Sequence, residues 1–265
     1  RGAQLKIGND YAFVNHIEDR VLNGGLSACA ALGEIKRNNL PFSTRISKPT
    51  LYRYISMGIF PHIKLEKRKQ AYKKTTAKRA TKGTCIEQRP LEVFARNTFG
   101  HWEMDCVEGK KGTRKTLLVL TERKTRNEII RLMNDKTAAS VIKALNALEK
   151  QLGSELFAQV FQTITVDNGS EFSDYEGIEQ SSIHKDRKRT KVYFCHPYSA
   201  YERGSNENQN RMVRRHYPKG YDFTNTTPAE IRKLEKWIND YPREMFNYYS
   251  SAELYEACIN SLMSA

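Results

Sequence analysis

The fold follows from residues 101–133, which read HWEMDCVEGKKGTRKTLLVLTERKTRNEIIRLM. Three runs rich in aromatic and aliphatic residues, at 101–107, 116–123 and 127–133, are separated by short polar links. Runs of this length and composition are typical of β-strands. Links as short as Lys124-Thr125-Arg126 predict that consecutive strands pair as an antiparallel meander.

The chain on the C-terminal side of this meander alternates helices and strands. Thr137 is placed to cap a long helix in which Val141, Leu145 and Leu148 recur every three or four residues. Strands are predicted at 161–166 and 192–195, and helices at 207–216 and 228–239. The order predicts an α/β domain, with a mixed five-stranded sheet flanked by helices.

The first 60 residues lack this alternation and predict three short helices, at 11–22, at 26–38 and after Ser47. Ser47 is a helix-capping residue type, and Pro49 suits the first turn of the helix that follows. The outer face of this third helix carries Lys48, Thr50, Tyr52 and Arg53. The arrangement predicts an all-α helix-turn-helix domain whose last helix reads DNA; a three-helix bundle without a DNA role is the alternative.

The charge of the chain favours a polyanionic partner. Lys and Arg number 44 against 30 Asp and Glu, a formal net charge of +14. The excess concentrates at 64–90, where we expect Lys73, Lys74, Lys78 and Arg79 to follow a DNA backbone; a solvated linker is the alternative. The expected organisation is a helix-turn-helix domain at 1–63, a basic linker at 64–95 and an α/β domain at 96–265.

Other features narrow the cellular setting. No run approaches the roughly 18 apolar residues of a membrane span, and no secretory leader is visible, so we expect a cytoplasmic protein. The five cysteines are scattered without a CxxC pair, which predicts reduced thiols and, for want of ligand spacing, no zinc site. The chain begins at Arg1 rather than Met, so we expect that it is a fragment or a trimmed chain.

Three acids are placed where the predicted sheet can gather them. Asp105 lies in the first strand, Asp167 ends the fourth, and Glu207 is expected to open a helix after Gly-Ser-Asn. If the first and fourth strands are neighbours, Asp105 and Asp167 emerge side by side. Mg²⁺ prefers oxygen ligands, and two such ions about 3.5–4 Å apart clamp the attacking and leaving oxygens of phosphoryl transfer. The trio therefore predicts a two-metal catalytic site.

Longer motifs make the sequence recognisable. The segments GHWEMDCVEGKKGTRKTLLVLTERKTR, TVDNGSEF and CHPYSAYERGSNENQNRMVRRHYPKG, with IEQRPLEV before them, resemble bacterial insertion-sequence transposases of the DDE type. More narrowly, they resemble the family usually numbered thirty among insertion sequences. The resemblance covers residues 86–265 strongly and the helix-turn-helix region more loosely.

This resemblance implies an RNase H-like, retroviral-integrase-like core that depends on Mg²⁺ or Mn²⁺ and cuts and joins transposon ends. It places the family's three metal ligands on Asp105, Asp167 and Glu207. The implied partners are double-stranded DNA (inverted-repeat ends and target) and further copies of the chain, in a dimer or a larger assembly. The implied location is the bacterial cytoplasm, at the nucleoid.

The same motifs assign roles to neighbouring residues. Asn210, Arg211 and Arg214 follow Glu207 on one helix face and are expected to hold the DNA backbone. Glu202 is the nearest competing acid. Residues expected to support the structure rather than to react are Glu103, Glu122, Glu171, His101, Trp102 and His196.

One departure from the family lies between Asp167 and Glu207, where the gap is longer than the family's habit. The extra residues are strongly basic, with Lys185, Arg187, Lys188, Arg189 and Lys191. A DNA contact and a solvated hairpin tip are both open for this insertion. Other functions left open are a nuclease or a retroviral-type integrase, although the N-terminal module lacks the His/Cys zinc spacing, and a DNA-binding regulator without catalytic activity.

Overall fold

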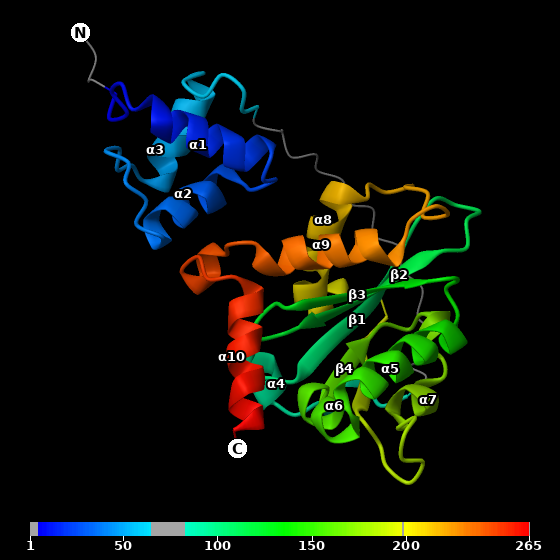
Figure 1. Ribbon diagram of the computed structural model, residues 1–265. Coiled ribbons are helices and arrows are strands. Elements are labelled where there is room, and N and C mark those ends of the chain that lie inside the picture. Colours follow the sequence, from blue (N-terminus) through cyan, green and yellow to red (C-terminus); the bar gives the residue numbers. More distant parts are fainter. Residues whose placement is uncertain (1–4, 65–82, 198, 265) are drawn as a thin grey trace. The chain divides into compact units, whose positions relative to one another are not determined.

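The computed structural model describes residues 5–64, 83–197 and 199–264 (Figure 1). Packing divides the chain into two units. The helical unit comprises residues 1–73 and 241–250, and the sheet unit comprises residues 74–240 and 251–265. The predicted Lys73, Lys74, Lys78 and Arg79 lie outside the described residues.

The helical unit contains the three predicted helices, α1 (Tyr11–Leu22), α2 (Ala28–Arg37) and α3 (Lys48–Ser56). Ser47 caps α3 by accepting a hydrogen bond from the Thr50 amide, and Pro49 lies in the first turn, as predicted. Phe13, Ile17 and Leu51 are fully buried at the centre of the unit. The apolar spacing seen in the sequence therefore forms one small core.

Residues 241–250 complete the helical unit, although the helices on either side of them belong to the sheet unit. The Tyr241 hydroxyl accepts a hydrogen bond from the Ser27 amide at 2.8 Å, and Lys48 Nζ contacts Glu244 Oε2 at 2.5 Å. Tyr248 packs so closely on α2 that a Cβ at Gly33 would lie 1.9 Å from its ring. The boundaries expected from the sequence assign this segment to the other domain.

The sheet unit is built on five strands in the order β3-β2-β1-β4-β5. They are β1 (His101–Glu108), β2 (Thr116–Glu122), β3 (Glu128–Met133), β4 (Thr163–Val166) and β5 (Lys191–Phe194). β2 runs antiparallel to both β1 and β3, whereas β1, β4 and β5 pair in parallel. This order and polarity are those of an RNase H-like core, so the predicted fold class is confirmed.

Helices cover both faces of the sheet (Figure 1). They are α4 (Glu92–Ala95), α5 (Ala138–Leu152), α6 (Ser154–Val160), α7 (Tyr175–Glu179), α8 (Gly204–His216), α9 (Pro228–Asp240) and α10 (Ser251–Met263). Trp102 and Met104 of β1 join the core with α5 and α6. Because strand residues alternate between faces, Glu103 and Asp105 point to the other face, where α8 contacts β1 and β2. All seven β2 residues are buried, as expected for a strand covered on both sides.

The basic insertion is held by ion pairs inside the sheet unit. The Arg189 side chain is fully buried, with NH1 3.1 Å from Glu149 Oε2. Lys188 and Lys191 contact the buried Glu179 at 2.7 and 3.0 Å. Arg189 therefore faces neither DNA nor solvent, whereas the side chains of Lys188 and Lys191 remain 66% and 40% exposed. Within the described residues, no helix combines the length and the apolar character needed to cross a lipid bilayer.

Candidate active site

Asp105 and Asp167 are neighbours across two parallel strands. β1 pairs with β4 so that Trp102 lies beside Ile164 and Glu103 lies beside Thr165. Continued by two residues, this register sets Asp105 beside Asp167, which directly follows β4. Both carboxylates therefore leave the sheet at the carboxyl end of the two strands.

Arg203 joins the two carboxylates. Its NH2 lies 2.9 Å from Asp167 Oδ2, and its NH1 lies 3.4 Å from Asp105 Oδ1. Burial alone would lower the pKa of Arg203, but Asp105 and Asp167 raise it above its usual range, so the guanidinium stays charged. No local sequence pattern singles out this arginine, because its two contacts depend on β1 and β4 lying side by side.

Backbone amides fix the orientation of both acids. The Cys106 amide donates to Asp105 Oδ1 and the Gly169 amide to Asp167 Oδ1, each at 2.8 Å. Gly169 also leaves room for a further carboxylate, since a Cβ there would lie 2.9 Å from Asp167 Oδ1 and 2.5 Å from Glu171 Oε2. Glu171 is buried beside Lys136, with Nζ 3.1 Å from its Oε1, and its Oε2 has no hydrogen-bond partner among the residues that the structure describes.

The third predicted acid reaches the site on helix α8. This helix begins at Gly204, not at Glu207 as predicted, so Glu207 lies at its fourth residue. The buried Glu103 carboxylate accepts a hydrogen bond from the Asn206 amide at 2.8 Å, which holds the first turn of α8 against β1. One turn later, Asn210 Nδ2 donates to Asp105 Oδ2 at 3.0 Å. Helix α8 is thus attached to β1 on both sides of Glu207.

The Glu207 side chain does not join the other two acids in this structure. Its Oε1 pairs with Arg211 NH2 at 3.2 Å, and its side chain is 43% exposed. In the part of the chain that the structure describes, the three acids do not form a group whose ligand oxygens all lie within 4.8 Å of one another. The fold therefore brings together Asp105 and Asp167 and leaves Glu207 on the adjoining helix face.

The donor set fits hard divalent cations. Asp105 and Asp167 present carboxylate oxygens to the guanidinium of Arg203, and Glu171 adds a buried oxygen that no described residue contacts by a hydrogen bond. Oxygen ligands of this kind suit Mg²⁺ and Mn²⁺. Burial and then the carboxylates of Glu171 and Asp105 raise the pKa of the Cys106 thiol above its usual range. Cys106 therefore stays a neutral thiol beside the acids.

The residues predicted to contact DNA have the following surroundings. On α3, Arg53 is exposed, Lys48 pairs with Glu244, Thr50 contacts Ser47, and Tyr52 packs partly into the helical core. On α8, Asn210 contacts Asp105, Arg211 contacts Glu207, and Arg214 donates to the Glu108 carbonyl at 2.9 Å. Lys48 and Arg211 are each paired with a carboxylate, and Arg214 donates to a carbonyl. Fewer of the predicted cations are therefore free to bind phosphates than the sequence suggests.

His101, Trp102 and Glu122, which the sequence predicts to support the structure, make contacts of that kind. His101 Nδ1 contacts Thr163 Oγ1 at 2.9 Å, and Trp102 Nε1 donates to the Val160 carbonyl at 2.7 Å. The Glu122 carboxylate accepts hydrogen bonds from the amides of Lys124 and Thr125, which stabilises the turn into β3. Glu202, the competing acid, contacts His196.

Curated relatives, and not a family model, assign the chain to a family. No family model matches the chain. It is 33% identical over 251 residues to the transposase for insertion sequence element IS4351 of Bacteroides fragilis, covering 91% of this chain and 72% of that protein. It is 29% identical over 226 residues to the transposase InsI for insertion sequence element IS30C of Escherichia coli strain K12, covering 80% of this chain and 56% of that relative.

Among solved structures, the catalytic core domain of BIV integrase matches with a TM-score of 0.43 and 15% identity, covering 63% of this chain and 99% of that one. The relation to the insertion-sequence transposases is the stronger one, since it extends over nine-tenths of the chain. The chain belongs to the family of insertion-sequence transposases.

Proposed function

We propose that this transposase cuts DNA at the ends of its element and joins the freed 3′-hydroxyl to target DNA, using Asp105, Asp167 and Glu207 as ligands for two Mg²⁺ or Mn²⁺ ions. The observation that carries the proposal is the register of β1 and β4, which places Asp105 beside Asp167 with one guanidinium shared between them. Two divalent ions held there would stabilise the charge of an in-line phosphoryl displacement.

In this proposal Glu207 joins the other two acids by rotating its side chain away from Arg211. It lies three residues before Asn210 on α8, and side chains at this spacing share a helix face. Asn210 already contacts Asp105 at 3.0 Å, so this face of α8 is turned toward the first acid. The pair that holds Glu207 is an exposed i,i+4 ion pair, an arrangement that stabilises a helix by only about 0.3–0.5 kcal/mol. Releasing Glu207 from Arg211 therefore costs little.

The charge of the chain supports DNA as the substrate. A net charge of +14 favours phosphate binding through counterion release. We assign end recognition to residues 1–63, with α3 and Arg53 at the groove, and passage along the backbone to the basic linker at 64–95. Because two element ends must be joined, the working form on DNA is a dimer or a larger assembly, and its place in the cell is the nucleoid.

The test is cleavage and joining of an end-labelled duplex that carries an element end, with Mg²⁺ or Mn²⁺. We expect Asp105→Asn and Asp167→Asn to lose about a thousandfold in rate, since a metal ion contributes several kcal/mol to such a transition state, while binding to the duplex persists. Glu207→Gln should behave in the same way. Asp186→Asn is the matched control, because this acid is 80% exposed in the basic loop.

The outcomes separate the candidate functions. Wild-type activity in Asp105→Asn or Asp167→Asn would refute the assignment of the acids. Duplex binding by the wild-type chain without cleavage or joining in either metal would refute the enzymatic proposal and support a DNA-binding regulator.

A further inference from the structure

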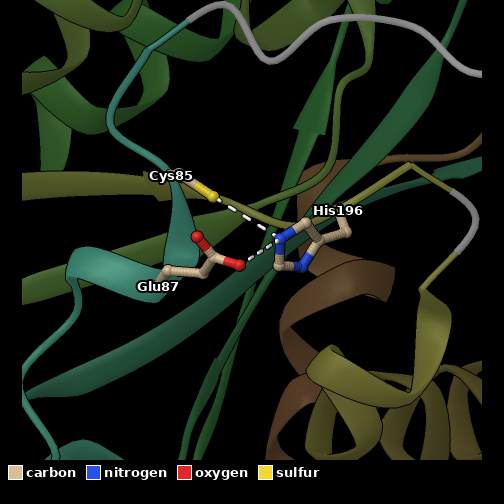
Figure 2. Close-up of side chains that lie close together, drawn as sticks. All are labelled: Cys85, Glu87 and His196. Atoms are coloured by element: carbon tan, nitrogen blue, oxygen red, sulfur yellow. Dashed lines mark hydrogen bonds and ion pairs between the residues drawn. The ribbon is translucent and has the colours of Figure 1, made fainter.

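A second group of potential metal ligands lies at the carboxyl end of β5, the strand that runs parallel to β4. The thiol of Cys85, the carboxylate of Glu87 and the imidazole of His196 offer ligand atoms that all lie within 4.8 Å of one another. His196 Nε2 is 3.7 Å from Cys85 Sγ and 3.3 Å from Glu87 Oε1. Figure 2 shows the thiol and the carboxylate converging on the same ring nitrogen.

The fold holds the two contributing segments together without help from these side chains. Cys85 forms a parallel bridge with Phe194, and the Phe194 amide donates to the Thr84 carbonyl at 2.8 Å. Ile86 is buried, which fixes the short 3-10 turn that carries Glu87. Cys85 and His196 are 111 residues apart in the chain, so their backbones are brought together by the pairing at the edge of β5.

The distances are those of a tetrahedral zinc site. Zn²⁺ lies about 2.3 Å from sulfur and about 2.0 Å from nitrogen or oxygen, which sets sulfur and nitrogen about 3.5 Å apart and nitrogen and oxygen about 3.3 Å apart. The corresponding separations here are 3.7 and 3.3 Å. We propose that Cys85, Glu87 and His196 bind one Zn²⁺ ion, with a water molecule as the fourth ligand.

The surroundings of His196 support this assignment. Its other ring nitrogen, Nδ1, lies 2.7 Å from Glu202 Oε1, and its backbone amide donates to Glu202 Oε2 at 2.8 Å. A zinc-bound histidine almost always gives its second N–H to a carboxylate or a carbonyl, which fixes the ring and leaves the other nitrogen for the metal. Glu202 holds His196 in this way, with Nε2 directed at Cys85 and Glu87.

The donor types distinguish this site from the catalytic one. A thiolate and an imidazole favour zinc, whereas the three catalytic acids supply only oxygen, which favours Mg²⁺ and Mn²⁺. Binding replaces the proton on the Cys85 sulfur and any proton on His196 Nε2 by the metal, and these protons pass to solvent. The site is accessible to water, since the side chains of His196 and Glu87 are 40% and 76% exposed. The bound ion would fasten residues 83–89 to the end of β5.

Cobalt and zinc titrations of the full chain test the proposal. After treatment with a chelator, the chain is titrated with Co²⁺, and absorption from thiolate-to-cobalt charge transfer is recorded; Zn²⁺ is then added in competition. We expect one equivalent of cobalt with thiolate absorption, displaced by one equivalent of zinc. Cys85→Ser should abolish this absorption, and Glu202→Gln should weaken zinc binding about 10- to 100-fold.

Matched controls make the result specific. Cys258→Ser and His184→Ala remove a thiol and an imidazole on other parts of the sheet unit and should leave the titration unchanged. The double variant Asp105→Asn/Asp167→Asn should also retain the absorption, because it alters only the catalytic carboxylates. The proposal is overturned if the wild-type chain shows no thiolate absorption, if Cys85→Ser retains it, or if the double variant loses it. Circular dichroism of Cys85→Ser and of Glu87→Gln, whose side chain is exposed, confirms that loss of binding is not loss of folding.

Discussion

At the scale of single residues, Arg203 determines the charge around Asp105 and Asp167. Its guanidinium contacts both Asp105 and Asp167, so it neutralises the same oxygens that we propose as ligands for divalent ions. The Arg203 side chain is only 11% exposed, so its guanidinium is held beside the two acids. A cation added to the site must therefore displace the guanidinium or share the carboxylates with it.

Replacing Arg203 with Met should tighten the binding of Mn²⁺. Each partly exposed ion pair contributes about 0.2–1 kcal/mol, so losing the two contacts should lower the Mn²⁺ dissociation constant about twofold to thirtyfold. Free Mn²⁺, followed by electron paramagnetic resonance during a titration, gives the constant. Arg203→Lys keeps the charge and should stay close to the wild-type value. Weaker binding in Arg203→Met would mean that Arg203 organises the carboxylates instead of opposing the metal.

At the scale of elements, the attachment of α8 to β1 depends on one buried acid. Glu103 is completely buried, forms an ion pair with the buried Arg123 and accepts the Asn206 amide. Removing one partner of a buried pair leaves an uncompensated charge, which costs about 3–5 kcal/mol. We expect Glu103→Ala to lower the free energy of unfolding of the sheet unit by this amount.

Urea unfolding measures this loss. The matched control is Asp240→Ala, which removes an exposed i,i+4 pair with Lys236 and should cost no more than about 0.5 kcal/mol. If Glu103→Ala cost as little as Asp240→Ala, the attachment of α8 would have to come from other contacts. Asn210 and Asp105 are the next candidates.

The elements that the sequence predicts well are those whose signal is local. Alternation and β-branched content place β1, β2 and β3 to within about two residues of the observed bounds, and Ser47 and Thr137 cap α3 and α5 as predicted. The start of α8 was missed because Gly-Ser-Asn has the composition of a turn. The contact that stabilises it, between Glu103 and Asn206, joins residues 103 positions apart.

The same distinction applies to the sites. Asp105 and Asp167 could be paired from the sequence because neighbouring parallel strands place their carboxyl ends together. Arg203 could not, because only the register of β1 and β4 gives it two partners. The sequence predicts a reduced thiol at Cys85 and a structural role for His196, because no local pattern connects two residues that are 111 positions apart.

At the scale of the whole molecule, charge governs the approach to DNA. Each phosphate that the protein neutralises releases a counterion and contributes about 0.9 to the slope of log K against log salt concentration. We expect Lys73→Gln/Lys74→Gln to reduce the slope for duplex binding by up to about 1.8. Filter binding or fluorescence anisotropy at several salt concentrations gives the slope.

The control for charge alone is Lys143→Gln/Lys150→Gln. These exposed lysines lie on α5, on the face of the sheet opposite to Glu103 and Asp105. This variant loses the same charge and should keep the wild-type slope. Equal slopes in the two double variants would show that residues 73 and 74 make no phosphate contact.

The path of residues 241–250 has a consequence for synthesis and for engineering. During translation, the three N-terminal helices are made before this segment, so Gly33 on α2 cannot contact Tyr248 until residues 74–240 of the sheet unit have been made. Cutting the gene once cannot isolate a finished helical unit. An exchange of the helical unit between relatives requires two separate pieces of coding sequence, and a chimera that carries only the first would pair foreign helices with the host's Tyr241 and Tyr248.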